Sequence, residues 1–209
     1  MNETKRKKLK VAVLTIRNFI SFEAIVKAIE IGILKDKATV EVLMTIKRST
    51  SCKRKAKEYN IPYELVDFTK HIGTREEFEL KIIKVLDRYK CDLIVFAGMR
   101  IVSQMFIDHF NGNIINFHNS LLPSFKGMHA CTEALDYGVK VSGATIHFID
   151  AKVDNGPIII QKSVPVYDND TPYILMRRII ICANVILPKA IELICDNKLH
   201  IEGRIVKVG

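Results

Sequence analysis

Three polar residues in the second half of the chain are of types that can stabilise developing charge and move protons. Asn116 and His118 flank Phe117 on a segment that predicts a β-strand, and strand alternation places both polar side chains on one face. Asp154 begins an Asp-Asn-Gly-Pro stretch that predicts a turn directly before an apolar strand. If that turn folds back over the sheet, an amide, an imidazole and a carboxylate lie together.

Each of these residues also has a purely structural interpretation. A buried Asn and His on one strand face can simply be a hydrogen-bonded pair. An Asp in such a turn most often caps its own backbone. The residues between them, Ser120-Leu121-Leu122-Pro123 followed by Gly127, predict a stiff loop rather than a helix, which gives the catalytic interpretation more weight.

The elements that must position these residues alternate between strand and helix in the first half of the chain. Ser21 predicts a cap for a helix over 22–31, with Gly32 as its stop, and Thr74 with Glu77 predicts a capping box for a helix ending near Tyr89. Further expected elements are strands over 9–15, 38–45, 63–66 and 93–96, and a helix over 50–59.

After residue 112 the strands follow one another closely, at 113–118, 141–150 and 157–161, before a helix from Thr171 onward. The sequence therefore predicts an α/β fold: a doubly wound, Rossmann-like, mostly parallel sheet extended by antiparallel strands. Sites in such folds gather at the carboxyl ends of strands, where His118 lies. We expect one domain, with a basic tail at 1–8, a nucleotide-binding-like half at 9–112 and a catalytic half at 113–209.

Composition narrows the possible partners. The chain of 209 residues has a net charge of +9, which favours anionic small molecules, and much of the excess lies in a short basic N-terminal tail that we interpret as a solvated end. No basic run interleaved with aromatic residues occurs elsewhere, so we do not expect a nucleic-acid partner. Five cysteines without a CxxC pair and no membrane-length apolar run predict a cytoplasmic protein with no membrane association.

The motifs resemble those of a known family. Asn116 to Pro123, then Gly127, then Asp154-Asn155-Gly156-Pro157-Ile158-Ile159 are similar to the 10-formyltetrahydrofolate-dependent formyltransferases, and among them to the glycinamide ribonucleotide formyltransferases of purine synthesis. The resemblance covers nearly the whole chain. It extends to Thr74-Arg75-Glu76, to Ala97 through Val102 and to Glu202-Gly203-Arg204.

The resemblance implies transfer of a formyl group from 10-formyltetrahydrofolate to the amine of glycinamide ribonucleotide, with Asn116, His118 and Asp154 as catalytic residues. It implies folate contacts from Asn116 and from Arg75, Met99, Arg100, Ile101 and Val102. It places His147 behind the site as a supporting residue. No spacing of His, Cys or Asp fits a metal site, and the reaction needs no metal.

Two departures leave the acceptor open. Where these formyltransferases carry a glycine-rich phosphate loop, this chain has Arg17, Asn18, Phe19, Ile20 and Ser21. Arg17 and Ser21 could rebuild a phosphate site, or the acceptor could lack that phosphate. In the late helix, Ala183-Asn184 replaces an acidic residue and a His that contact the acceptor in these enzymes. Another amine, such as an amino sugar nucleotide, and a non-catalytic folate-binding relative remain alternatives, as do monomer and homodimer.

Overall fold

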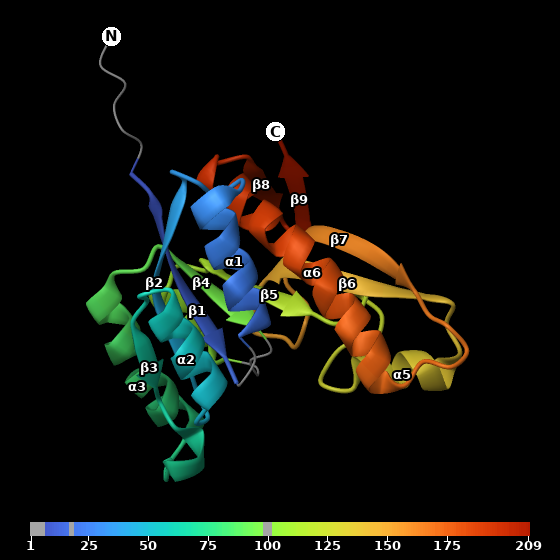
Figure 1. The fold of residues 1–209 in the computed structure, drawn as a ribbon, viewed down its shortest axis with the longest axis horizontal. Helices are drawn as coiled ribbons and strands as arrows, with labels where there is room; N and C mark the ends of the chain where they lie inside the picture. The colour runs from blue at the N-terminus through green and yellow to red at the C-terminus, as the bar shows by residue number, and fades with distance from the viewer. Residues whose placement is uncertain (1–6, 17–18, 98–101) are drawn as a thin grey trace.

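The computed structural model describes residues 7–16, 19–97 and 102–209. Within these ranges seven strands form one sheet in the order β3-β2-β1-β4-β5-β6-β7, and a separate hairpin, β8-β9, lies near the C-terminus (Figure 1). The strands are β1 Leu9–Thr15, β2 Ala38–Thr45, β3 Tyr63–Leu65, β4 Leu93–Ala97, β5 Ile114–His118, β6 Val141–Phe148, β7 Ile158–Pro165, β8 Leu199–Glu202 and β9 Ile205–Val208.

Strands β1 to β5 run parallel, whereas β6 is antiparallel to β5 and β7 is antiparallel to β6. This mixed topology confirms the predicted fold class, including the change after residue 112 from alternating strands and helices to closely spaced strands. The loop before β6 starts at the carboxyl end of β5, where the predicted site lies. The loop between β6 and β7 starts near the amino end of β5, because Phe148 pairs with Ile115, so it must fold back along the sheet to reach that site.

Helices cover both faces of the sheet. They are α1 Ile20–Ile31, α2 Thr50–Glu58, α3 Arg75–Tyr89, α4 Gln104–His109, α5 Ala130–Tyr137 and α6 Pro172–Cys195, with a short 3₁₀ turn at Phe68–Lys70. Helices α1, α2, α5 and α6 contribute to one apolar core, and α3 and α4 contribute to a second core across the sheet. Of the helices that the structure describes, none is long and apolar enough to cross a membrane.

The two predicted helix starts differ in outcome. Thr74 and Glu77 form the expected capping box at the start of α3, each side chain binding the other residue's backbone N–H. The predicted cap at Ser21 is wrong, because α1 begins at Ile20 with Phe19 as N-cap and no side-chain hydrogen bond. Ser21 is buried within the first turn, so its side chain faces the protein instead of the free N–H groups of the helix end.

Helix α6 continues to Cys195 although Pro188 lies inside it. A proline removes one hydrogen bond from a helix interior and costs about 3 kcal/mol there. Pro188 is buried, and its neighbours Leu187, Ala190 and Ile191 belong to the core formed with α1 and the sheet. Apolar burial of the helix face therefore outweighs the local penalty.

Candidate active site

Asn116 and His118 lie on the same face of β5, at its carboxyl end. Both are buried, and Phe117 between them packs into the core on the opposite face, as alternation predicts. In the register of β5 with β6, Asn116 is opposite His147 and His118 is opposite Thr145. The polar face of β5 lines a pocket of about 630 Å³ that opens beside these residues.

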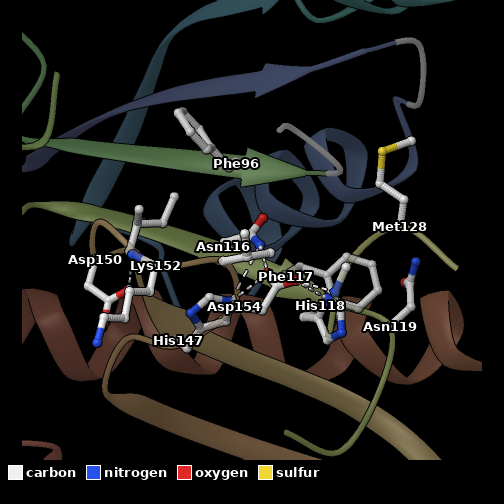
Figure 2. A pocket seen from close by; sticks show the side chains of 13 residues that line it. Phe96, Asn116, Phe117, His118, Asn119, Met128, His147, Asp150, Lys152 and Asp154 are labelled. Carbon is white, nitrogen blue, oxygen red and sulfur yellow. Dashed lines mark hydrogen bonds and ion pairs between the residues drawn. The ribbon is translucent and has the colours of Figure 1, made fainter. Parts of the chain in front are cut away.

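Asp154 reaches the same pocket from the loop between β6 and β7 (Figure 2). Its Oδ2 accepts a hydrogen bond from the Gly127 N–H at 2.8 Å and lies 3.3 Å from His118 Nδ1. Its Oδ1 lies 3.5 Å from Asn116 Nδ2. The turn does fold back over the sheet, so the structure brings together the three side chains that the sequence singled out.

Both ring nitrogens of His118 face hydrogen-bond acceptors. Nε2 lies 2.8 Å from the Phe125 carbonyl oxygen, which can only accept, so Nε2 carries a proton and donates it. Nδ1 faces the Asp154 carboxylate. The contact at Nδ1 is long for a charge-assisted hydrogen bond, so Nδ1 is the nitrogen that a bound ligand oxygen can share.

His147 supports Asn116 from behind. Its Nδ1 donates to the Phe148 carbonyl oxygen at 2.7 Å, so its Nε2 is left as an acceptor, 3.4 Å from Asn116 Nδ2. Burial lowers the pKa of His147, which keeps the ring neutral and preserves that acceptor. The amide nitrogen of Asn116 is thus oriented toward His147 and Asp154. Within the described chain its Oδ1 is buried and has no hydrogen-bond partner.

The loop after β5 is held by side chains that sequence analysis did not assign. Thr145 Oγ1 donates to the Ser120 carbonyl oxygen at 2.6 Å and accepts from the Leu122 N–H at 3.1 Å. Gln161 Nε2 donates to the Leu122 carbonyl oxygen at 2.8 Å. These bonds use backbone atoms of the loop, which every residue possesses, so no residue pattern reveals them. They fix the loop whose Phe125 carbonyl orients His118.

The pocket has further lining residues that sequence analysis missed: Phe96, Asn119, Met128, Ile149, Asp150, Lys152 and Val153. Like Asn116, Asn119 has a buried Oδ1 with no partner among the described residues. Asn119 directly follows His118, and its position in the motif was the only signal that could have identified it.

The predicted folate and acceptor contacts are described only in part. Arg75 begins α3, and its Nε donates to Glu79 at 3.0 Å. Val102 is buried just before α4. Neither residue is among the described residues that line the pocket. Met99, Arg100 and Ile101 lie outside the described residues, as do Arg17 and Asn18.

At the acceptor end, three of the five predicted residues are described. Phe19 caps α1 with backbone only, half-exposed Ile20 begins the helix, and Ser21 is buried. The Lys55 ammonium lies 5.8 Å from the centre of the Phe19 ring. In the ranges 7–16, 19–97 and 102–209, no cluster of three or more His, Cys, Asp or Glu could hold a metal ion.

Comparisons with known proteins place this geometry in a family. The family model described as formyl transferase matches residues 9–191. The chain is 35% identical over 197 residues to the trifunctional purine biosynthetic protein adenosine-3 of Gallus gallus, and this match covers 93% of the chain but 19% of that protein's length. It is 37% identical over 155 residues to the phosphoribosylglycinamide formyltransferase of Mycobacterium tuberculosis, covering 74% of the chain and 72% of that protein.

Solved structures agree. The crystal structure of glycinamide ribonucleotide transformylase 1 from Symbiobacterium toebii superposes with a TM-score of 0.91 at 34% identity, covering 96% of this chain and 94% of that one. These matches confirm both the resemblance and the fold inferred from the sequence. With a family model matching most of its length, the chain belongs to the formyl transferase family.

Proposed function

We propose that this protein transfers the formyl group of 10-formyltetrahydrofolate to the amine of glycinamide ribonucleotide, a step of purine biosynthesis. The observation that carries the proposal is the convergence of Asn116, His118 and Asp154 on one pocket, with Asp154 3.3 Å from His118 Nδ1 and 3.5 Å from Asn116 Nδ2. The relatives from Mycobacterium tuberculosis and Symbiobacterium toebii are named for this activity and match most of their own length, which supports the same acceptor here.

The site contains the groups that such a transfer requires. The acceptor amine attacks the formyl carbon, and negative charge develops on the formyl oxygen. Asn116 Nδ2 and His118 Nδ1 are the donors that can turn from Asp154 to that oxygen, and loss of one such donor lowers a rate by about 10²–10³-fold. Asp154 then accepts the proton of the attacking amine, directly or through water. The intermediate collapses, the bond from carbon to the folate nitrogen breaks, and that nitrogen takes up the proton that Asp154 accepted from the amine, so that tetrahydrofolate leaves and the carboxylate is restored.

Substrate binding follows from the same assignment. Folate is held by Asn116 and by Arg75, Met99, Arg100, Ile101 and Val102, and His147 keeps the Asn116 amide in its donor orientation. The acceptor approaches from Arg17, Asn18, Phe19, Ile20 and Ser21. We also propose that the chain has a nucleotide-binding-like half at 9–112 and a catalytic half at 113–209. A cytoplasmic location belongs to the same proposal.

One observation favours a second acceptor within the same reaction. The start of α1 is capped by Phe19 with no side-chain hydrogen bond, and the Ser21 side chain is buried. Of the described residues, neither offers a hydroxyl to a phosphate at this helix end. An amine without a phosphate at this position, such as that of an amino sugar nucleotide bound through other groups, would not need a hydroxyl at this helix end.

A direct assay tests the proposal. Purified protein is incubated with 10-formyltetrahydrofolate and glycinamide ribonucleotide, and tetrahydrofolate formation is followed alongside the formylated product. We expect product formation in proportion to tetrahydrofolate. Tight folate binding with no product from glycinamide ribonucleotide, but with product from an amino sugar nucleotide, would reassign the acceptor. Folate binding with no transfer to either amine would refute the enzymatic proposal.

A further inference from the structure

Asn155, the residue next to Asp154, joins three separate segments of the chain. Its Oδ1 accepts a hydrogen bond from Lys126 Nζ at 2.9 Å, and its Nδ2 donates to Asp150 Oδ2 at 2.9 Å. Its backbone carbonyl oxygen accepts from Arg204 Nη1 at 2.7 Å. Asn155 therefore makes one hydrogen bond within the loop after β6, one to the loop after β5 and one to the C-terminal hairpin.

The loop that carries Asp154 needs such ties because its backbone is strained. Asp154 has a φ of +43°, a left-handed conformation that costs a residue with a side chain on the order of 1–3 kcal/mol unless its surroundings hold it. The loop also lies tightly against β6, since a Cβ at Gly156 would come within 1.8 Å of the Phe148 carbonyl oxygen. Relaxation of the strain would move the carboxylate away from His118.

The contact with Lys126 lies directly beside the contact that orients the carboxylate. Gly127 follows Lys126, and its N–H donates to Asp154 Oδ2 at 2.8 Å. Two consecutive residues of one loop thus bind two consecutive residues of the other: Lys126 binds Asn155, and Gly127 binds Asp154. The two cross-links lie next to each other and join the same pair of loops.

Arg204 binds the backbone of the same residue. It lies in the turn of the β8-β9 hairpin, 49 residues away in sequence, and β9 packs beside β7 (Figure 1). Its guanidinium donates a charge-assisted hydrogen bond, which is stronger than one between neutral groups. The hairpin lies outside the seven-stranded sheet, and this contact links it to the loop that carries Asp154.

We propose that Asn155 is a positioning residue that, anchored by Lys126 and Arg204, holds the Asp154 carboxylate against His118. The effect on turnover rests on the proposed function, in which Asp154 accepts the amine proton. Asn155 itself does not touch the substrate, and it is absent from the described lining of the pocket. A displacement of about 1 Å in a reacting group can lower a rate by about 10²-fold, so loss of the anchors should act on turnover rather than on binding.

The test compares Asn155→Ala and Arg204→Ala with wild type and with Arg88→Ala. Arg88 is an exposed arginine that binds Glu64 at 2.9 Å, far from the site in the fold, and serves as a matched control. We expect kcat to fall at least about tenfold in Asn155→Ala and severalfold in Arg204→Ala, with KM for both substrates changed less than about threefold. Arg204→Ala removes only an exposed side chain, so it keeps the test valid if Asn155→Ala does not fold.

A second readout does not depend on activity. The Gly127 amide reports directly on the Asp154 carboxylate, so its ¹H–¹⁵N resonance should shift and its hydrogen exchange should quicken about tenfold in both variants but not in Arg88→Ala. An unmoved Gly127 amide, or a moved amide with kcat within twofold of wild type, overturns the inference. If wild type itself shows no transfer, the proposed function fails, and the Gly127 amide alone then decides whether Asn155 positions Asp154.

Discussion

Asp154→Asn is the substitution that separates the charge of the site from its shape. The asparagine keeps an oxygen that can accept from the Gly127 N–H, so the loop keeps its cross-link. It removes the negative charge 3.3 Å from His118 Nδ1 and the only carboxylate within hydrogen-bonding distance of Asn116 among the described residues. We therefore expect a folded protein that binds folate and transfers formyl very slowly.

The structure sets the size of the effect. The side chains of His118 and Asp154 are 7% and 13% exposed, and Asp154 Oδ2 lies 3.3 Å from His118 Nδ1, so solvent screens their interaction only weakly. Only the part that grows in the transition state affects the rate. Loss of a general base costs about 10²–10⁴ in rate, or about 2.7–5.4 kcal/mol. We expect kcat to fall within that range.

The assay measures kcat and KM for both substrates, folate affinity by titration calorimetry and the midpoint of thermal unfolding. Asp168→Asn is the control, because Asp168 is an 87% exposed carboxylate paired with exposed Lys140 at 2.9 Å, and such a surface pair contributes about 0–1 kcal/mol. A kcat for Asp154→Asn within threefold of wild type, with unfolding midpoints alike, would refute the assignment of Asp154 as the proton acceptor.

Three further results are expected. His118→Ala should lower kcat by about 10²–10³-fold with folate affinity little changed, measured by the same transfer assay and titration; undiminished turnover would show that the ring does not act on the formyl group. The free energy of unfolding should decrease as pH falls below about 6.5, with a slope of up to about 1.4 kcal/mol per pH unit. The reason is that burial lowers the pKa of His147 from its ordinary value of 6.5, so the unfolded chain binds that proton at a higher pH than the folded protein does. Urea unfolding of wild type and His147→Gln between pH 7.5 and 5.5 checks this, since the variant should lose that share of the slope. Gly156→Ala should lower the free energy of unfolding by about 1–3 kcal/mol, because its Cβ would lie 1.8 Å from the Phe148 carbonyl oxygen, and a midpoint equal to that of wild type in a thermal melt would contradict this contact.

Local patterns were enough to predict most elements and part of the site. The alternation of β5 placed Asn116 and His118 on one face before any tertiary contact was known, and the Thr74 capping box was predicted correctly. Both depend on residues within three positions of each other, whose relative placement a strand or helix dictates. The start of α1 was misplaced, because a serine can cap a helix or be buried in its first turn, and packing chooses between the two.

The sequence by itself determined the family and the residue types of the site: an amide and an imidazole on one strand face, and a carboxylate in a turn. Only the tertiary structure decided that the turn returns to His118 and that the Phe125 carbonyl oxygen accepts a hydrogen bond from His118 Nε2. It also decided that Arg204 binds the loop from 49 residues away. The reason is physical. Strand and helix periodicity act over a few residues. These contacts instead involve backbone groups that every residue has, and they join segments that are brought together only by the packing of the whole sheet.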